Sequence, residues 1–341
     1  MEASTMSSVP LEAGESDEGE LARCVAALAR TTRPLIAMHE FPDGDALGSA
    51  LALGLLLEAR GARVTVYSPQ GAPPNLRFLP GAERIVRSIP EAARFDLCIA
   101  CDAGDPSRLG TDLPPPERRG PTVNLDHHAG VPRFGEVNLV DGQASSTGVL
   151  VYRVMKRMGA SLTEPVATCL WVSLVSDTGS FRYSNTNAEC LRIAHELVEA
   201  GVRPGEISSR LFESQPLDRV RLLAEVLRTL SLSPCRRIAW LTAHSEAFAL
   251  AGTTEETVDG FVAYPRSIEG VEVALLFRQE AGGARVSLRS RGAVDVGAIA
   301  LGFGGGGHHN ASGCFVEGGL DEVRAKVLRE VERALVRPSG P

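Results

Sequence analysis

A short stretch near the N-terminus combines one imidazole with two carboxylates. His39, Asp43 and Asp45 lie within seven residues, and Pro42 and Gly44 restrict and bend the backbone between them. Carboxylate oxygens together with an imidazole and no thiolate suit Mn²⁺, Mg²⁺ or Fe²⁺ better than a structural zinc site. Taken alone, the two aspartates could equally serve as turn and helix-cap residues.

The residues on either side predict the two elements that position this stretch. Residues 35–39 form a short apolar run typical of a buried strand, and residues 46–60 follow the pattern of a helix that Gly61 ends. The stretch therefore follows the carboxyl end of a strand. Because open α/β sheets bind ligands at that edge, the sequence predicts a ligand or metal site there.

Further carboxylate and imidazole side chains follow later predicted strands and one helix. They are Asp102 after a strand over residues 96–101, Asp126, His127 and His128 after a strand over residues 122–125, and Asp177 after a helix over residues 164–176. Each alone has a structural alternative as a turn residue, a cap or a loop histidine. Because parallel strands end at one edge of their sheet, we expect these side chains to form a single site.

The order of elements along the chain predicts an α/β protein. Strands and helices alternate in the N-terminal part, which is typical of a largely parallel sheet with flanking helices. Helical patterns then dominate, and mixed strands and helices return near the C-terminus. We expect a disordered tail over residues 1–19, a catalytic domain over 20–200, a helical linker over 201–234, and a smaller mixed α/β domain over 235–337, with the active-site cleft between the two domains.

Composition excludes several classes of function. The net charge of −7 argues against a protein that grips long duplex nucleic acid, because such binding depends on clustered Lys and Arg. The sequence has no apolar run of membrane-spanning length and no signal-peptide pattern, so we expect no membrane partner. Seven cysteines are scattered singly, as expected for buried thiols in a reducing compartment. These features together predict a cytoplasmic protein.

Taken together, the motifs resemble those of the DHH phosphoesterase superfamily. The matching residues, in order, are His39-x-x-Pro42-Asp43-x-Asp45, Asp102, Asp126-His127-His128 and Asp177. Residues 304–313 resemble the glycine-histidine loop of the domain that accompanies DHH in its first subfamily. Within the superfamily, the chain length and residues 177–186 and 287–290 look most like the bifunctional oligoribonucleases and pAp phosphatases, or nanoRNases.

The resemblance implies two divalent cations, Mn²⁺ in the first place and Mg²⁺ as the alternative. One ion would be held by His39, Asp43 and Asp102, and the other by Asp45, Asp102, His127 and Asp177, so that Asp102 bridges them. Two such ions can activate a water and neutralise phosphate oxygens during in-line displacement. We assign His128 to the substrate phosphate or the leaving group, and Asp126 to the orientation of an imidazole.

The resemblance also implies substrate contacts, mostly in the C-terminal domain. Glycines let backbone amides approach an anion, and basic side chains donate charged hydrogen bonds. The expected substrate-binding residues are Arg182, Arg289, Ser290, Gly305, Gly306, Gly307 and His308. The expected substrates are short single-stranded RNA oligomers, hydrolysed to mononucleotides, and pAp, hydrolysed to AMP. A homodimer is a further expectation of the resemblance.

Three alternatives compete with this interpretation. Gly302-x-Gly304-x-x-Gly307 formally matches a dinucleotide-binding fingerprint, but here it follows a helix and leads into a strand, which is the reverse of that motif. A non-catalytic RNA-binding protein would not need a complete set of metal ligands. A soluble phosphodiesterase acting on cyclic di-AMP or pApA is the main alternative, because the same substrate contacts could serve it.

Overall fold

The computed structural model describes residues 13–128, 130–253, 258 and 260–336. The chain divides into two compact units, the first ending at Ser214 and the second beginning at Gln215. This division lies within residues 201–234, which the sequence predicts as a linker. The other predicted domain limits and the cleft between the domains stay predictions.

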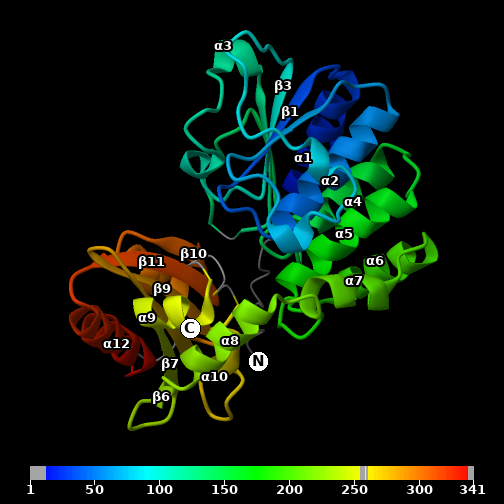
Figure 1. Cartoon of the computed structure of the whole chain (residues 1–341). Helices are drawn as coiled ribbons and strands as arrows, with labels where there is room; N and C mark the ends of the chain where they lie inside the picture. The colour runs from blue at the N-terminus through cyan, green and yellow to red at the C-terminus, as the bar shows by residue number, and fades with distance from the viewer. Residues whose placement is uncertain (1–12, 129, 254–257, 259, 337–341) are drawn as a thin grey trace, which may run out of the picture. The chain divides into compact units, whose positions relative to one another are not determined.

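The first unit contains a five-stranded parallel sheet with the strand order β2-β1-β3-β4-β5 (Figure 1). Its strands are β1 (Pro34–Met38), β2 (Thr65–Tyr67), β3 (Leu97–Cys101), β4 (Thr122–Asp126) and β5 (Val137–Val140). Every residue of β1, β3 and β4 is buried, as expected for a parallel sheet covered on both faces. All five strands run in the same direction, so their carboxyl ends form one edge.

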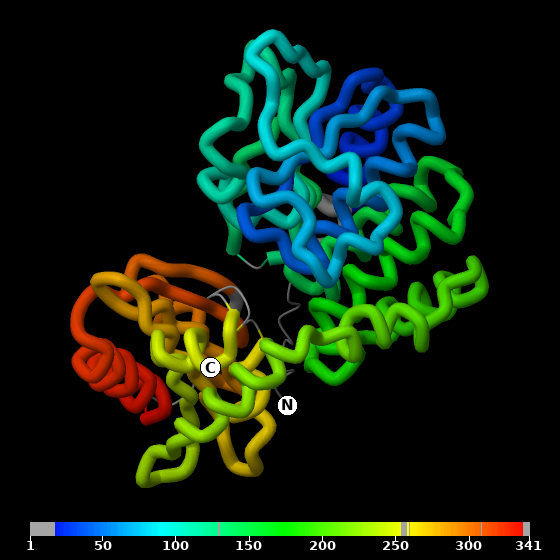
Figure 2. The backbone as a smooth tube through the Cα atoms, viewed as in Figure 1, coloured from blue at the N-terminus to red at the C-terminus, as the bar shows by residue number. Residues whose placement is uncertain are grey.

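Helices cover one face of this sheet, and long connections cover the other. The helices of the unit are α1 (Ala13–Arg30), α2 (Gly44–Ala59), the short α3 (Pro116–Arg119), α4 (Thr147–Arg157), α5 (Glu164–Asp177), α6 (Ala188–Glu199) and α7 (Pro204–Phe212). In β1, Ile36 and Met38 pack in the core beneath the helices, whereas Leu35 and Ala37 belong to a separate cluster on the other face. The connections before and after β3 contribute to that second cluster (Figure 2).

Close packing of α2, α4 and α5 fixes the helix ends that lie near the sheet edge. A Cβ added at Gly48 of α2 would lie 2.4 Å from the carbonyl oxygen of Cys169 in α5. A Cβ added at Gly148 of α4 would lie 2.0 Å from the Oγ of Ser173, also in α5. Only glycine permits these approaches, so the N-terminal turns of α2 and α4 are held against α5.

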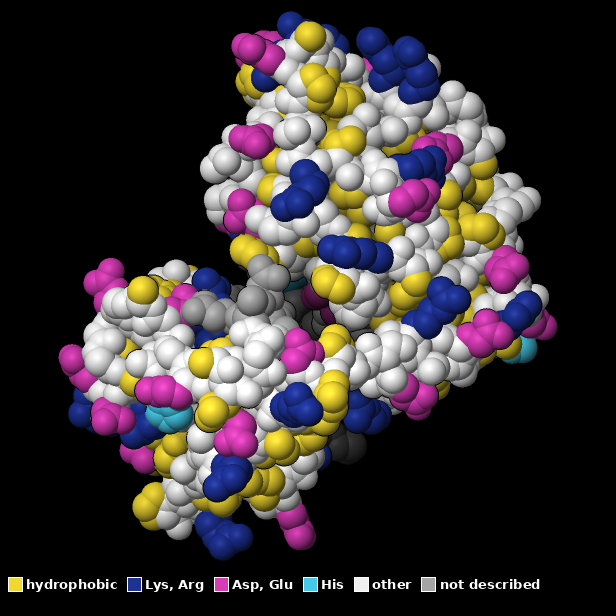
Figure 3. Space-filling view, viewed as in Figure 1, with side chains coloured by type: hydrophobic (Ala, Val, Ile, Leu, Met, Phe, Trp, Pro, Cys, Tyr) yellow, Lys and Arg dark blue, Asp and Glu magenta, His cyan; other side chains and the backbone are white. Residues whose placement is uncertain are grey.

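The second unit is built on a six-stranded mixed sheet with the order β10-β11-β9-β8-β7-β6. Its elements are α8 (Leu217–Leu227), β6 (Ser231–Leu232), β7 (Ile238–Ala243), α9 (Ser245–Ala251), α10 (Ala263–Arg266), β8 (Val273–Glu280), β9 (Gly283–Ser290), α11 (Val296–Leu301), β10 (Gly306–His308), β11 (Ala311–Glu317) and α12 (Leu320–Val336). Residues of α11 and α12 pack in one core cluster, and residues of α8 and α9 pack in another. In both units, acidic and basic side chains are interspersed over the face shown in Figure 3.

The predicted α/β class is confirmed, with a five-stranded parallel sheet followed by a six-stranded mixed sheet in the smaller unit. Several details differ from the sequence-based expectation. Helix α1 begins at Ala13, inside the segment predicted as a disordered tail, whereas residues 1–12 of that segment lie outside the described residues. Strand β5 and helix α9 were not predicted; β5 has only one fully buried residue, so its apolar signal is weak. The run expected as a glycine loop contains a strand, β10.

Within the described residues, no helix combines the length and apolar character that a membrane span requires.

Candidate metal centre

His39 directly follows β1, and its side chain is buried. Its Nδ1 lies 2.7 Å from the carbonyl oxygen of Glu40 and donates to it, so Nε2 keeps the lone pair. Nε2 lies 3.9 Å from Oδ1 of Asp43 and 3.8 Å from Oδ2 of Asp102. Burial lowers the pKa of His39, which favours the neutral ring that metals bind.

Asp43 is the N-cap of α2. Its Oδ1 accepts hydrogen bonds from the backbone N–H groups of Asp45 at 3.0 Å and Ala46 at 3.1 Å. Asp43 therefore does cap the helix, as its sequence position allows, but a capping carboxylate can still bind a metal ion through its other oxygen. One ligand atom from each of His39, Asp43 and Asp102 lies within 4.8 Å of the others, a spacing that can hold a metal ion.

Asp45 lies in the first turn of α2 and is completely buried. Its Oδ1 accepts from the hydroxyls of Ser49 at 2.9 Å and Ser173 at 2.6 Å. Its Oδ2 accepts from the backbone N–H of Thr147 at 2.7 Å, at the start of α4. The positive end of α4 thereby helps to stabilise this carboxylate. Oδ2 also lies 3.4 Å from Nε2 of His127.

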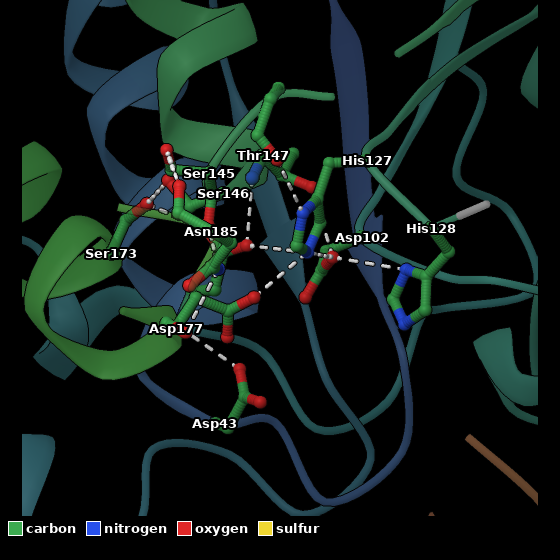
Figure 4. A network of polar contacts seen from close by, with 12 residues as sticks. Asp43, Asp102, His127, His128, Ser145, Ser146, Thr147, Ser173, Asp177 and Asn185 are labelled. Atoms are coloured by element: carbon green, nitrogen blue, oxygen red, sulfur yellow. Dashed lines mark hydrogen bonds and ion pairs between the residues drawn. The ribbon is translucent and has the colours of Figure 1, made fainter. Parts of the chain in front are cut away.

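His127 follows β4, and its Nδ1 lies 3.2 Å from the carbonyl oxygen of Ala144, to which it donates. Its Nε2 is thereby directed at the carboxylates, 2.9 Å from Oδ2 of Asp177 and 3.7 Å from Oδ1 of Asp102 (Figure 4). Asp177 is the last residue of α5. Ligand atoms of Asp45, His127 and Asp177 form a second group within 4.8 Å of one another.

Asp102 lies between the two groups. It follows β3 with a backbone φ of 56°, a left-handed conformation that is uncommon for residues other than glycine. Its Oδ2 faces Nε2 of His39, whereas its Oδ1 faces Nε2 of His127 and accepts a hydrogen bond of 2.9 Å from the hydroxyl of Thr147. One carboxylate therefore presents a different oxygen to each group, which is one arrangement by which a carboxylate can bridge two metal ions.

Asp126 and His128 form a pair beside these groups. Oδ1 of Asp126 accepts from Nδ1 of His128 at 2.6 Å and from its backbone N–H at 2.9 Å, and Oδ2 accepts from the backbone N–H of Gly104 at 2.6 Å. Burial alone would raise the pKa of Asp126, but the hydrogen bonds from His128 and Gly104 lower it overall. Asp126 thus stays ionised and orients His128, whose Nδ1 is also 3.5 Å from Asp102.

The concentration of negative charge in the cluster favours the binding of cations. Burial, and then the charges of Asp102 and Asp177, raise the pKa of Asp45 well above its ordinary value. Burial and the charge of Asp43 likewise raise the pKa of Asp102. Four carboxylates that repel one another, two of them buried, would be stabilised by divalent ions, and this oxygen-rich donor set with two imidazoles fits Mn²⁺ or Mg²⁺. The chain thus carries an acidic cluster able to bind metal.

Several polar residues that support the cluster were not predicted from the sequence. Thr147 holds both Asp45 and Asp102, one through its backbone N–H and the other through its hydroxyl. Asn185 donates to the carbonyl oxygens of Ser145 and Asp177 and so ties the end of α5 to the start of α4. The sequence signal for these residues is the run Ser145-Ser146-Thr147 where a helix begins. Such a run is also typical of an ordinary N-cap, so it does not identify a role in the cluster.

Replacing Thr147 by valine should weaken metal binding by roughly 10- to 100-fold, because the hydroxyl that orients the shared carboxylate is lost. Titration calorimetry with Mn²⁺ measures this effect directly. Thr147→Ser keeps the hydroxyl and should bind Mn²⁺ within a few-fold of the unmodified protein. Equal losses in both variants would show that the methyl group and its packing matter, rather than the hydrogen bond.

The stabilisation produced by Mn²⁺ should increase as the pH rises from about 5 to about 8. A carboxyl group whose pKa is raised on folding stabilises the fold below its unfolded pKa, and this contribution is lost as the pH rises through the folded pKa. The raised pKa values of Asp45 and Asp102 therefore destabilise the metal-free protein towards neutrality. Thermal melts with Mn²⁺ or with chelator should show a widening Tm difference; a constant difference would count against this electrostatic account.

The predicted substrate contacts of the second unit gather where β9, β11 and β10 lie side by side. Arg289 pairs with Ala311 of β11, which in turn pairs with His308 of β10. Ser290 is buried, and its hydroxyl donates to Oδ1 of Asn310 at 2.8 Å, so it fixes the turn between β10 and β11.

The glycines of this region differ in how much space is available for a side chain. A Cβ would lie 2.2 Å from a carbonyl oxygen at Gly305 and 2.5 Å from one at Gly307, but would meet nothing within 4 Å at Gly306. Gly305 and Gly307 are therefore required by the close approach of β10 to β11, which explains why a strand replaces the expected loop. Arg182 belongs to the first unit and follows α5; its side chain is exposed, and its Nε donates to the carbonyl oxygen of Gly179 at 2.6 Å.

The parallel sheet and the two ligand groups at its edge define the class of protein. Residues 33–174 match the DHH family, N-terminal domain, and residues 246–337 match the DHHA1 domain. The chain belongs to the DHH family.

Within the DHH family, the chain is similar to proteins with a named activity. A protein of Thermus thermophilus named bifunctional oligoribonuclease and PAP phosphatase NrnA is 37% identical over 307 residues, which cover 89% of this chain and 90% of that protein. The Bacillus subtilis protein of the same name is 28% identical and covers 82% of this chain and 87% of its own length.

Solved structures agree on the fold. An exopolyphosphatase-related protein from Bacteroides fragilis superposes with a TM-score of 0.87 at 26% identity, covering 94% of this chain and 98% of that one. RecJ from Thermus thermophilus, solved in complex with Mn²⁺, has a TM-score of 0.54 at 16% identity and covers 97% of this chain and 56% of that one, a likeness of fold alone.

Proposed function

We propose that this chain is a two-metal phosphoesterase that hydrolyses short oligoribonucleotides to mononucleotides and pAp to AMP. The single observation that carries the proposal is the position of Asp102, whose two oxygens face two separate groups of ligands. The names of the relatives supply the substrates. A cytoplasmic location, expected from the composition, and a homodimer, expected from the resemblance to the family alone, are part of the proposal.

Each side chain of the cluster takes a defined role in this proposal. His39, Asp43 and Asp102 would hold one cation, and Asp45, Asp102, His127 and Asp177 would hold the other. When bound, two divalent ions lower the pKa of an attacking water and neutralise phosphate oxygens in the transition state. Mn²⁺ is the first choice and Mg²⁺ the second, because both accept carboxylate and imidazole ligands.

His128 protonates the leaving oxygen in this scheme. Asp126 accepts a hydrogen bond of 2.6 Å from its Nδ1, which fixes the orientation of the ring. The proton to be transferred is then carried on Nε2. Because Nδ1 is engaged by Asp126, we place His128 on the substrate rather than on a metal ion, although its donor atoms also lie within 4.8 Å of those of Asp102 and His127.

In the second unit, we propose that Arg289 binds a substrate phosphate. Its replacement by alanine should raise KM for pAp by roughly 10- to 100-fold, the equivalent of one charge-assisted hydrogen bond. Steady-state kinetics at saturating Mn²⁺ measures this, and kcat should change little. Arg329→Ala, an exposed arginine on α12, is the matched control. An unchanged KM in Arg289→Ala would reject the role.

Product analysis tests the proposed function as a whole. The protein is incubated with pAp, with RNA oligomers of graded length, with pApA and with cyclic di-AMP, each with Mn²⁺ or with chelator. We expect AMP from pAp and mononucleotides from the short oligomers, only when metal is present. Turnover of cyclic di-AMP or pApA without turnover of pAp or short RNA would favour the alternative phosphodiesterase instead.

A further inference from the structure

Phe41 lies between two of the candidate metal ligands and is exposed. The residue has 71% of its surface accessible, more than Phe212, Tyr264 or Phe315, the other exposed Phe and Tyr residues of the described chain. Exposed phenyl rings lose the favourable burial that normally accounts for phenylalanine in a fold. The fold therefore gains little from a phenyl ring at this position.

The backbone at Phe41 is also held in an uncommon conformation. Its φ is 54°, which is rare for a bulky side chain and would suit glycine better. Two hydrogen bonds maintain it: the N–H of Glu40 donates to the carbonyl oxygen of Arg108 at 2.7 Å, and the N–H of Phe41 donates to Oε1 of Gln70 at 3.1 Å. Strain that the surroundings maintain tends to occur at functional sites.

Three of the four other described non-glycine residues with positive φ also belong to the cluster or follow it in the chain; the fourth, Arg236, lies in the second unit. Asp102 is itself a candidate ligand, and Ser180 and Phe181 come soon after Asp177. Phe181, however, packs against the core of the first unit, where its ring lies 5.6 Å from that of Trp171. Phe41 combines an uncommon backbone with an exposed ring, so its ring is available to a ligand.

Distance along the chain places this ring within reach of a nucleotide bound at the cluster. Phe41 is two residues from His39 and two from Asp43, so its Cα lies within roughly 7.6 Å of each of theirs. A nucleoside attached to a phosphate at these ligands extends over a similar distance. A flat, apolar, exposed ring is suited to stacking against a flat aromatic group, and nucleobases of every kind offer such a face.

We propose that Phe41 is a stacking platform for a nucleobase of the substrate. This inference rests on the proposed function and deepens it: the metal ligands act on the phosphate, while Phe41 selects phosphoesters that carry a base. Because stacking depends little on the identity of the base, Phe41 would favour nucleotides over base-free phosphates without reading the sequence.

The test compares substrates with and without bases in three variants. Phe41→Ala should raise KM for a diribonucleotide by roughly 5- to 100-fold, the range of one base stacked on an aromatic ring, and leave KM for the fully abasic dinucleotide within about twofold. Phe41→Trp should keep both values near those of the unmodified protein. Phe212→Ala, another exposed phenylalanine in the first unit, is the matched control and should change neither. Mn²⁺ affinity should be equal in all variants.

A spectroscopic measurement separates this inference from the proposed function. The Phe41→Trp variant adds a third tryptophan to Trp171 and Trp240, and AMP should quench the fluorescence of this added residue. The fluorescence of Trp171 and Trp240 is measured in the unmodified protein. If Phe41→Ala leaves KM for the diribonucleotide unchanged, or raises both KM values equally, the stacking role is wrong. If the unmodified protein hydrolyses neither pAp nor short RNA, the proposed function fails. The role of Phe41 then depends on the fluorescence measurement alone. Quenching by AMP would support the stacking role, and no quenching would overturn it.

Discussion

Replacing Asp102 by asparagine is expected to lower kcat/KM for pAp by roughly a thousandfold or more, because both cations lose their shared carboxylate. Asparagine has nearly the same shape, and its Oδ1 can still accept the hydrogen bond that Thr147 donates to Asp102. The loss would therefore come from charge and coordination rather than from a change of fold. Steady-state kinetics with Mn²⁺ at several concentrations measures it.

Two further observations make the Asp102→Asn result specific. Asp105→Asn is the matched control, because Asp105 lies three residues further on and only caps a short 3₁₀ helix through Ser107. Its activity should stay within a few-fold of the unmodified protein. Without metal, Asp102→Asn should melt at a higher temperature than the unmodified protein near pH 7, since a carboxylate is removed from a group of like charges. Near-normal turnover by Asp102→Asn would rule out a bridging role.

The second large effect concerns His128. Its replacement by asparagine should reduce kcat for a diribonucleotide by roughly 10²- to 10⁴-fold, because the leaving ribose oxygen then departs without a proton from a positioned acid. A nucleotide p-nitrophenyl ester has a leaving group that needs no proton. Its hydrolysis should fall far less in the same variant.

The contrast between the two substrates distinguishes acid catalysis from metal binding. If His128 were a metal ligand, both substrates would lose activity to a similar degree, and Mn²⁺ affinity would fall as well. His195→Asn provides the control, since His195 lies exposed on α6 beside Glu199. It should leave both rates unchanged.

The ligand residues and the strands that carry them could be predicted because the relevant signals are local. A short apolar run followed by His39, or by Asp102, identifies a strand end from a few residues. Parallel strands share an edge, so the convergence of these side chains follows from the fold class. The structure brings the predicted ligands together in two groups, His39, Asp43 and Asp102 in one and Asp45, His127 and Asp177 in the other. Asp102 also lies 3.7 Å from Nε2 of His127.

The supporting interactions could not be predicted because each joins segments far apart in the chain. Thr147 contacts Asp45 and Asp102 across 102 and 45 residues, and a hydroxyl before a helix gives no sign of such partners. The conformation of Phe41 is equally hidden, since its φ depends on hydrogen bonds made by Gln70 and Arg108. Strand β10 depends on close contact with β11, whereas a glycine run by itself favours a loop.

The position of bound metal ions relative to Asp102 shows whether this carboxylate joins two ions. Crystals soaked with Mn²⁺ and measured at the manganese absorption edge locate the ions by anomalous scattering. We expect two peaks, roughly 3.5 to 4 Å apart, with Asp102 coordinating both ions. Peaks that leave Asp102 uncoordinated, or a single ion held by only one of the two groups, would contradict this expectation.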